Sequence, residues 1–297
     1  MHLAIDGVTI GHWTDDRART GCTVIRLPPD ATASGEVRGG APATREFALL
    51  DPTRLVATID AVVLTGGSAF GLAAADGVVD LLAQEGRGFP TAHGPVPIVV
   101  AMALYDLGVG DPAVRPDADA GRAALRAADR YPATGRVGAG TGATVGKWRG
   151  PDAARPGGLG IVEIRRGAVA VAAVVAVNAA GDVDDGTLGP AMVEGTAAPW
   201  PDRSTFGGDA AGSGGTNTTI GVVVTNAAID KVGCRLLAEG AHDGLARAIV
   251  PPHMRSDGDA MVAVSAGAEQ AELDEVRLMA VVATEQAVRE AVGSIEE

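Results

Sequence analysis

The junction between a glycine-rich segment and an apolar run is the part of this sequence best equipped for chemistry. The residues Gly214–Thr219 read GGTNTT, and the apolar run Thr219–Asn226 follows at once. A break between Asn217 and Thr218 would leave Thr218 with a free α-amine beside its hydroxyl. The unperturbed pKa of such an amine is about 7.7–8.0, so one residue can supply both nucleophile and general base, and no histidine is required. Local sequence leaves a second interpretation open, in which these threonines are β-branched residues that begin a strand.

No metal or cofactor site is predicted. The five histidines are scattered without ligand spacing, and Cys22 and Cys234 have neither CxxC spacing nor nearby histidines, which argues against a zinc site and a disulfide framework. The glycine-rich residues 138–143 lack the lysine and serine of a phosphate-binding loop. The residues 65–69, TGGSA, lack the second glycine of a nucleophile elbow. We therefore expect catalysis by side chains and backbone alone.

Composition favours one compact unit of 297 residues. Hydrophobic residues make up 46% of the chain but aromatic residues only 3%, so the core must be built from Ala, Val, Leu and Ile, with 42 glycines that let layers approach closely. A net charge of -13 argues against nucleic acid or an anionic membrane as partner. No apolar run is long enough for a membrane span and no secretion signal is visible, so we expect a cytoplasmic protein.

The first half of the chain contains strand, turn and helix signals. Short strands are expected at Val8–Ile10 and Cys22–Leu27, and Val37–Pro42 is a glycine-rich loop. The run 61–64 is a strand that ends in a glycine turn and leads into a helix, with Ser68 as the expected N-cap. A second helix is expected at 116–129, on the surface side of the fold.

The second half supplies the strongest strand signals. A hairpin of Gly160–Ile164 and the Ala/Val run Val169–Val177 comes first. The residues 182–216 lack periodicity, and a segment of this length is uncommon in a compact domain unless it is functional or disordered. Beyond it come a strand at 219–226, a helix at 231–249, a strand at 261–265 and a helix at 272–292 whose residues 276, 279, 280, 283 and 287 form the buried face. The pattern predicts a layered α/β or α+β domain in which helices cover a central pair of sheets.

Five ordered motifs, spread from the N-terminus to beyond the hairpin, identify a family. The chain resembles the L-aminopeptidase/D-esterase family of N-terminal-nucleophile hydrolases, which also holds the β-peptidyl aminopeptidases and the nylon-oligomer hydrolase. The motifs are Asp6–His12 (DGVTIGH), Arg38–Glu46 (RGGAPATRE), Leu64–Leu72 (LTGGSAFGL), Gly138–Lys147 (GAGTGATVGK) and Val177–Asp182 (VNAAGD). The resemblance implies an α/β sandwich of two sheets between helix layers, self-cleavage into a large chain 1–217 and a small chain 218–297, and a homotetramer.

Within this family the sequence is most similar to the nylon-oligomer hydrolase branch, which implies a nucleophile. Asn217-Thr218 stands where the aminopeptidase branch carries Gly-Ser. By this match the Thr218 hydroxyl first attacks the carbonyl of Asn217 in an N-to-O acyl shift, and water hydrolyses the ester. The same oxygen then attacks the substrate amide.

The other site residues are likewise implied by the resemblance. Asn178 matches an asparagine that donates to the developing oxyanion, and Lys147 matches a lysine whose charge favours the neutral Thr218 amine. Asp257 and Asp259, which are Ser and Glu in the aminopeptidase branch, match the pair that holds the nucleophile and its amine. On local sequence alone Asn178 is a strand-end turn residue, Lys147 a solvated surface residue, and the aspartates a turn or a weak calcium loop.

The leading hypothesis is therefore hydrolysis of an amide in a small peptide or an ω-amino-acid oligomer through an acyl-Thr218 intermediate. Two alternatives remain at this point. Ornithine acetyltransferases share the fold and expose a threonine by self-cleavage, so the chain could transfer acyl groups. A binding or scaffold protein could also have kept the fold without catalysis, and it would persist as an intact chain.

Overall fold

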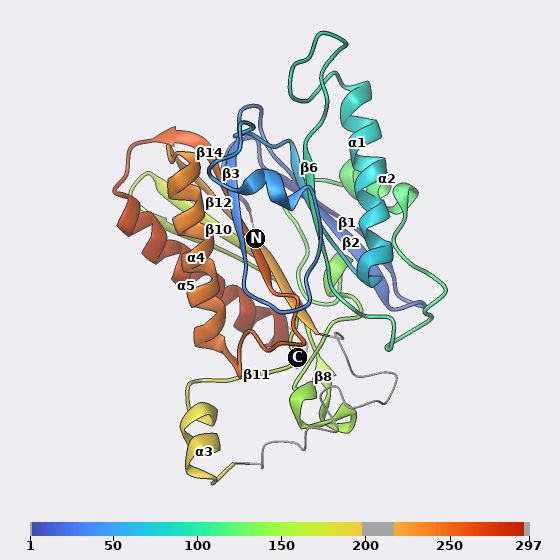
Figure 1. The fold of residues 1–297 in the computed structure, drawn as a ribbon, viewed down its shortest axis with the longest axis vertical. Coiled ribbons are helices and arrows are strands. Elements are labelled where there is room, and N and C mark those ends of the chain that lie inside the picture. The colour runs from blue at the N-terminus through green and yellow to red at the C-terminus, as the bar shows by residue number, and fades with distance from the viewer. Residues whose placement is uncertain (1, 198–216, 294–297) are drawn as a thin grey trace.

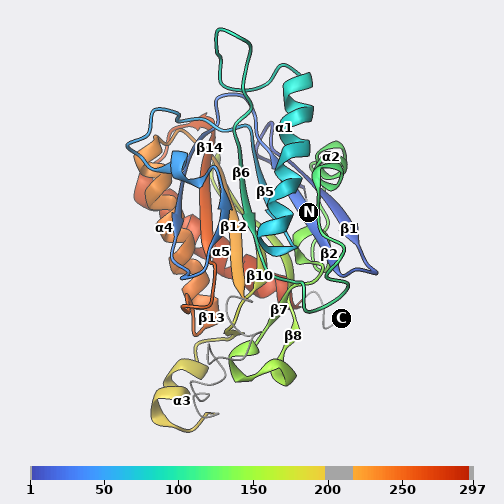
Figure 2. The same cartoon turned by 45° about the vertical axis from the view of Figure 1, so that its right-hand side comes forward.

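The computed structural model describes residues 2–197 and 217–293, and it places two β-sheets face to face between two layers of helices. Figure 1 shows α1 and α2 on one side of the molecule and α4 and α5 on the other. In the turned view of Figure 2 the order of layers is helix, sheet, sheet, helix. The predicted layered sandwich of two sheets flanked by helices is confirmed.

Each sheet has five strands and one parallel pair near its middle. The first sheet has the order β1-β2-β5-β6-β4, with only β5 and β6 parallel. The second has the order β3-β14-β12-β10-β9, with only β12 and β14 parallel. The strand bounds are β1 Thr9–Asp15, β2 Thr20–Arg26, β3 Thr32–Val37, β4 Ala43–Arg45, β5 Ala61–Thr65, β6 Val99–Ala103, β9 Gly158–Arg166, β10 Val169–Asn178, β12 Thr218–Ala227 and β14 Ala260–Glu269.

Helices α1 and α2 cover the first sheet, and α4 and α5 cover the second. The helices are α1 Ala74–Gln84, α2 Ala118–Arg126, α3 Leu188–Glu194, α4 Lys231–Ala248 and α5 Leu273–Gly293. Short 3-10 turns are η1 Phe47–Leu50, η2 Ser68–Ala73, η3 Gly138–Gly140, η4 Lys147–Arg149 and η5 Pro151–Ala153, and two small ladders pair β7 Thr144–Val145 with β8 Arg155–Pro156 and β11 Asp182–Val183 with β13 Ile249–Val250.

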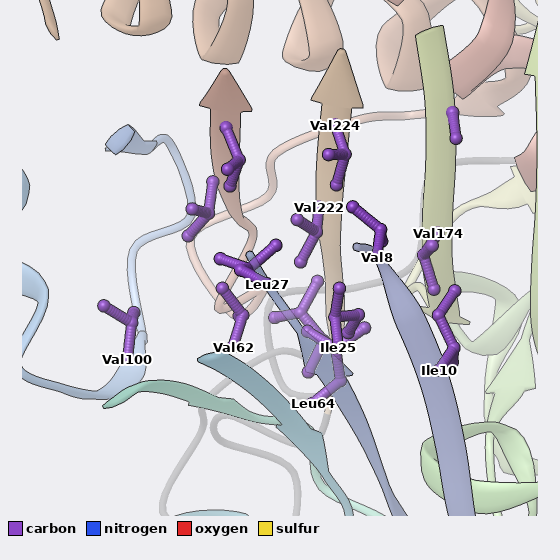
Figure 3. Close-up of a cluster of buried hydrophobic side chains, with 14 of the residues drawn as sticks. Val8, Ile10, Ile25, Leu27, Val62, Leu64, Val100, Val174, Val222 and Val224 are labelled. Carbon is purple, nitrogen blue, oxygen red and sulfur yellow. The ribbon is translucent and has the colours of Figure 1, made fainter. Parts of the chain in front are cut away.

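The core between the sheets is aliphatic, as the low aromatic content predicted. Alternating residues of facing strands point into it, among them Ile25, Leu64, Val174 and Val222, all at most 1% exposed (Figure 3). The opposite faces of the same strands meet the helices, which is why β10 is buried along its whole length. The predicted buried residues of the last helix are confirmed, since all five lie in the core between α5 and the second sheet.

Glycine lets α1 and α2 cross in contact. A Cβ on Gly77 would lie 1.7 Å from the carbonyl oxygen of Ala118, and one on Gly121 would lie 1.9 Å from that of Ala74. Real Cβ atoms never approach backbone so closely, so any side chain at either position would push the helices apart. The abundance of glycine in the sequence therefore reflects close packing between layers as well as turns.

The structure departs from prediction at several elements. Ser68 is not a helix N-cap: it opens η2 at a φ of 55°, and α1 begins at Ala74. The first strand is longer than predicted, since β1 runs to Asp15. Strands β3 and β4 were not predicted. The segment 182–197, predicted to lack periodic structure, contains β11 and α3. The rest of that segment, 198–216, lies outside the described residues.

Candidate active site

Thr218 begins the central strand of the second sheet. Strand β12 lies between β10 and β14, and Thr218 pairs in register with Asn178 at the end of β10. Thr218 is 4% exposed, and Asn178 is fully buried. The run of apolar β-branched residues after Thr218 forms this strand because both of its faces are covered, which fixes the position of the threonine at one end of the sheet.

The carbonyl group of Asn217 lies between two hydrogen-bond donors. The backbone N–H of Gly258 donates to its oxygen at 3.0 Å, and the hydroxyl of Thr218 donates to the same oxygen. The side-chain amide of Asn217 donates to the Ser256 hydroxyl at 3.4 Å. A carbonyl that is attacked by a nucleophile gathers negative charge on its oxygen, and a fixed N–H aimed at that oxygen stabilises this charge.

A tight turn at Asp257–Asp259 supplies that N–H. The carboxylate of Asp257 accepts from the backbone N–H of Ala180 at 3.1 Å and from that of Met254 at 2.7 Å. The carboxylate of Asp259 accepts from the backbone N–H of Thr219 at 2.7 Å. The pair thus joins the turn to the end of β10 and to the residue that follows Thr218.

The predicted glycine-rich loop packs directly on this turn. The Ala41 N–H donates to the carbonyl of Asp257 at 2.8 Å, and the Gly39 N–H donates to that of Asp259 at 3.1 Å. A Cβ on Gly258 would lie 2.7 Å from both the Thr218 hydroxyl oxygen and the Ala41 carbonyl oxygen. Glycine at 258 is therefore required for the backbone to approach the threonine.

Lys147 lies at the other side of the strand end, on η4. Its ammonium donates to the side-chain oxygen of Asn178 at 2.8 Å and to the Asn178 carbonyl at 3.1 Å. Burial lowers the pKa of Lys147 to about 7, and the charge of Asp257 opposes that shift. The local prediction of a solvated lysine is wrong, because Lys147 is half-buried and its ammonium donates to the buried Asn178.

The side chain of Asn178 is fixed on both its ends. Its oxygen accepts from Lys147 and from the Thr144 N–H, the latter at 2.9 Å, and its amide nitrogen donates to the Tyr105 carbonyl at 2.9 Å. These contacts settle which end of the amide is the donor. The nitrogen lies on the Tyr105 side, and the oxygen lies on the Lys147 side.

Asp182 anchors the segment that carries Lys147. This buried carboxylate accepts from the Trp148 indole at 2.7 Å, from Arg149 at 2.8 Å and from Arg155 at 2.7 Å. Trp148 itself is fully buried. Because Trp148 and Arg149 directly follow Lys147, this cluster determines where the lysine can reach.

The pKa of Asp257 is displaced by its surroundings. Burial and the neighbouring charge of Asp259 raise the pKa of Asp257 to about 7, whereas its two backbone donors and Lys147 lower it. A lysine and a carboxyl that both change protonation near neutral pH lie at one strand end, which is a pattern typical of active sites.

All five residues that the sequence singled out converge at this end of the second sheet, and others join them. The described residues contain no cluster of His, Cys, Asp and Glu that could hold a metal ion. Sequence reasoning missed Gly258 as a donor, Asp182 as an anchor, and His253, whose Nδ1 lies 2.8 Å from the Asp259 carboxylate. Position between Asp257 and Asp259 was the one available signal for Gly258, and the sequence around His253 offered none.

Comparison with known proteins decides the family. Residues 3–297 match peptidase family S58. The chain belongs to this family. As an S58 peptidase it hydrolyses amide bonds, and its sheets and helices have the N-terminal-nucleophile hydrolase arrangement.

Relatives of this S58 peptidase are known by sequence and by structure. An uncharacterized aminopeptidase of Mycobacterium leprae is 40% identical over 90% of this chain and 78% of its own. The 6-aminohexanoate-oligomer endohydrolase of Paenarthrobacter ureafaciens is 32% identical over 89% of this chain and 74% of its own. The L-aminopeptidase D-Ala-esterase/amidase of Ochrobactrum anthropi shares the fold with a TM-score of 0.71 at 20% identity, over 97% of this chain and 84% of that chain.

Proposed function

We propose that this S58 peptidase cuts its own chain between Asn217 and Thr218 and then hydrolyses small peptides or ω-amino-acid oligomers through an acyl-Thr218 intermediate. Lys147, Asn178, Asp257 and Asp259 are the residues proposed to assist Thr218. No cofactor or metal enters the proposal.

One observation carries it, namely the position of the Asn217 carbonyl between the Thr218 hydroxyl and the Gly258 N–H. The hydroxyl lies beside the carbonyl that it would attack, and the N–H at 3.0 Å lies where the oxyanion would form. The neighbouring Thr219 fits less well, because its hydroxyl is buried without a partner among the described residues. Thr216 lies outside those residues.

The cleavage consumes one water molecule. The Thr218 oxygen bonds to the Asn217 carbonyl carbon, the carbon–nitrogen bond breaks, and the hydroxyl proton goes in net to the departing nitrogen. Water then hydrolyses the ester, which releases the Asn217 carboxylate and leaves Thr218 with a free amine. That amine takes the hydroxyl proton in each later turnover, and it returns a proton to the leaving amine of the substrate.

The site suggests where the acyl part of a substrate binds. In the uncut chain the carbonyl of Asn217 occupies the place of a substrate carbonyl, and its side chain donates to Ser256. Once Asn217 withdraws, the vacated position accepts an acyl group next to Gly258. The names of the two relatives, an aminopeptidase and a 6-aminohexanoate-oligomer endohydrolase, support peptides and ω-amino-acid amides as the substrates to test.

The decisive experiment compares two isosteric substitutions at adjacent threonines. Thr218→Val should stay uncut on denaturing electrophoresis and lose turnover by roughly 10⁴-fold or more, as removal of a covalent nucleophile does. Thr219→Val should be cut, because its hydroxyl has no partner among the described residues. N-terminal sequencing of the small fragment from the parent protein should begin Thr-Thr-Ile. An uncut Thr218→Val protein with full activity would refute the proposal.

Turnover measurements and denaturing electrophoresis also separate the hydrolase from the two alternatives, an acyltransferase and a scaffold protein. An acyltransferase would consume an acyl donor rapidly only when an amino-acid acceptor is added, whereas the proposed hydrolase needs water alone. A scaffold protein would stay in one piece through prolonged incubation.

We further propose a cytoplasmic homotetramer, which light scattering on the purified protein and cell fractionation would test. Within the described part of the chain, no helix is both long and apolar enough to traverse a lipid bilayer.

A further inference from the structure

A half-buried histidine, His253, lies against Asp259, one of the two aspartates of the site. The Nδ1 atom of His253 is 2.8 Å from one carboxylate oxygen of Asp259, and the side chains are 16% and 3% exposed. A carboxylate at such depth is costly unless a polar group is bonded to it. The contact between His253 and Asp259 therefore helps to stabilise the turn.

The carboxylate of Asp259 links this histidine to the nucleophile strand. Its second oxygen accepts the Thr219 N–H at 2.7 Å. We assign the proton of the first contact to Nδ1 of His253, because the carboxylate oxygen that it meets is a hydrogen-bond acceptor. A line of two hydrogen bonds thus runs from the His253 ring through Asp259 to the amide that directly follows Thr218.

Backbone and packing fix the orientation of the ring. His253 has a φ of 50°, in the left-handed region that non-glycine residues rarely adopt. The ring of His242 meets it edge-on with centroids 4.9 Å apart, and the Nε2 of His242 bonds to the Glu36 carbonyl at 3.0 Å. Burial lowers the pKa of His242 to about 3, so that ring is neutral and does not repel its neighbour.

We propose that His253 is a positioning residue, which holds the Asp259 carboxylate in the orientation that aligns Thr219 and, through it, Thr218. This inference rests on the proposed function, because it assigns Thr218 as the nucleophile. His253 does not touch the reacting atoms. Its loss lets the Asp259 carboxylate rotate away from the Thr219 N–H, and the nucleophile moves out of line with the Gly258 N–H.

The test uses two substitutions that both tolerate the left-handed backbone. His253→Gly removes the donor, whereas His253→Asn places an amide N–H near the position of Nδ1. A misplacement of about 1 Å in a nucleophile costs roughly 100-fold in rate. We therefore expect His253→Gly to lower kcat by about 100-fold with KM within about threefold, and His253→Asn to recover most of the loss.

Turnover is calculated per cleaved chain, counted by denaturing electrophoresis, so that slow maturation is not mistaken for slow catalysis. His93→Gly, which removes an exposed histidine from the loop between α1 and β6, serves as the control and should retain its kcat. Thermal unfolding of each variant separates loss of alignment from loss of fold. Should His253→Gly not fold, the isosteric pair His253→Asn and His253→Asp decides, because Asn keeps an N–H donor and an ionised Asp does not. A kcat about 100-fold lower for His253→Asp than for His253→Asn supports the inference, and equal kcat values overturn it.

The two proposals fail in different ways. If His253→Gly turns over like the parent per cleaved chain, or if both variants fold and are equally inactive, the positioning role is wrong while Thr218 keeps its own role. If the parent protein is never cut and Thr218→Val is fully active, the proposed function fails before His253 is considered.

Discussion

Two buried aspartates, one beside each sheet, have the same chemistry and different surroundings. Asp106 lies beside the first sheet, and it accepts from the Gly67 N–H and from the Thr20 hydroxyl, both at 2.7 Å. Asp257 lies beside the second sheet and accepts from two backbone N–H groups. Burial raises the pKa of both carboxyls.

The difference lies in the charges around them. The contributions that shift the pKa of Asp106 come from burial and from neutral donors, whereas Asp257 also responds to Asp259 and Lys147. Asp106 links the glycine turn at Gly67 to Thr20 on β2, and no charged side chain contributes to its pKa shift. A carboxyl such as Asp106, which is buried with neutral donors only, therefore serves as a structural link. A carboxyl such as Asp257, which is buried beside an amine and a second carboxylate, has a pKa that depends on the charges in the site.

The same substitution at both positions should have unequal effects. Asp257→Asn removes the charge and offers one acceptor where two backbone N–H groups need one each, so the Gly258 turn loses its anchor. We expect kcat to fall by roughly 10²–10³-fold, as it does when an oxyanion donor is lost. Asp106→Asn keeps an acceptor for Gly67, and its kcat should change by less than about threefold. Steady-state kinetics of the two variants measures this, and equal losses would break the comparison.

Two lysines allow a second, smaller contrast. Lys147 donates to Asn178 in the site, whereas Lys231 donates to the carbonyls of Leu49, Arg54 and Val56 on the far side of the second sheet. Lys147→Met should lower kcat by about 100-fold, because a charge fixed at the site is lost.

Lys231→Met is the matched control, since it removes an equal charge from a purely structural position. It leaves carbonyl groups without their donor and should lower the free energy of unfolding by about 1–3 kcal/mol with kcat unchanged. Denaturant unfolding and kinetics on both variants distinguish the roles. A Lys231→Met protein that loses turnover while staying folded would contradict the contrast.

The smallest expected effect is on stability as a function of pH, measured in the uncut Thr218→Ala protein. The folded pKa of Asp257 is raised from 3.8 to about 7, so its contribution to stability falls as pH rises across that interval. The folded pKa of Lys147 is lowered from 10.5 to about 7, so its contribution rises as pH increases from about 7. The summed contribution of the two groups to the free energy of unfolding is therefore smallest near pH 7.

Melting temperatures across pH, compared with those of the same protein carrying Lys147→Met and Asp257→Asn, isolate this contribution. We expect the difference between the two curves to be largest near neutral pH and to amount to several °C. A difference that does not depend on pH would show that these two groups do not titrate in the folded protein.

The sequence predicted those features that depend on short-range pattern. The apolar runs of β10 and β12 were visible because both faces of these strands are buried, and α4 and α5 because their apolar residues repeat at helical spacing. Ser68 failed as a cap because the 3-10 turn Ser68–Ala73 stands between the glycine turn and α1, which begins at Ala74. The short strand β4 gave no signal, since three residues are too few for a period.

Only part of the candidate site could be predicted from the sequence. The resemblance named Thr218, Asn178, Lys147, Asp257 and Asp259, but spacing could not reveal that Lys147 is half-buried or that Gly258 donates to Asn217. His253 has an ordinary setting among prolines in the sequence, and its partner Asp259 becomes apparent only when the turn folds back. Contacts formed by a tight turn are geometric, and no residue pattern encodes them.

The strand order of the second sheet limits when a chain break can occur. Strands β12 and β14 follow the Asn217–Thr218 bond and lie between β3 on one side and β10 on the other, both of which precede it. The two pieces are thus interleaved, and each piece alone would expose strands that lack neighbours. The proposed cleavage therefore requires that the protein first assembles as one polypeptide, and the two proposed halves would stay together by backbone pairing until a denaturant separates them.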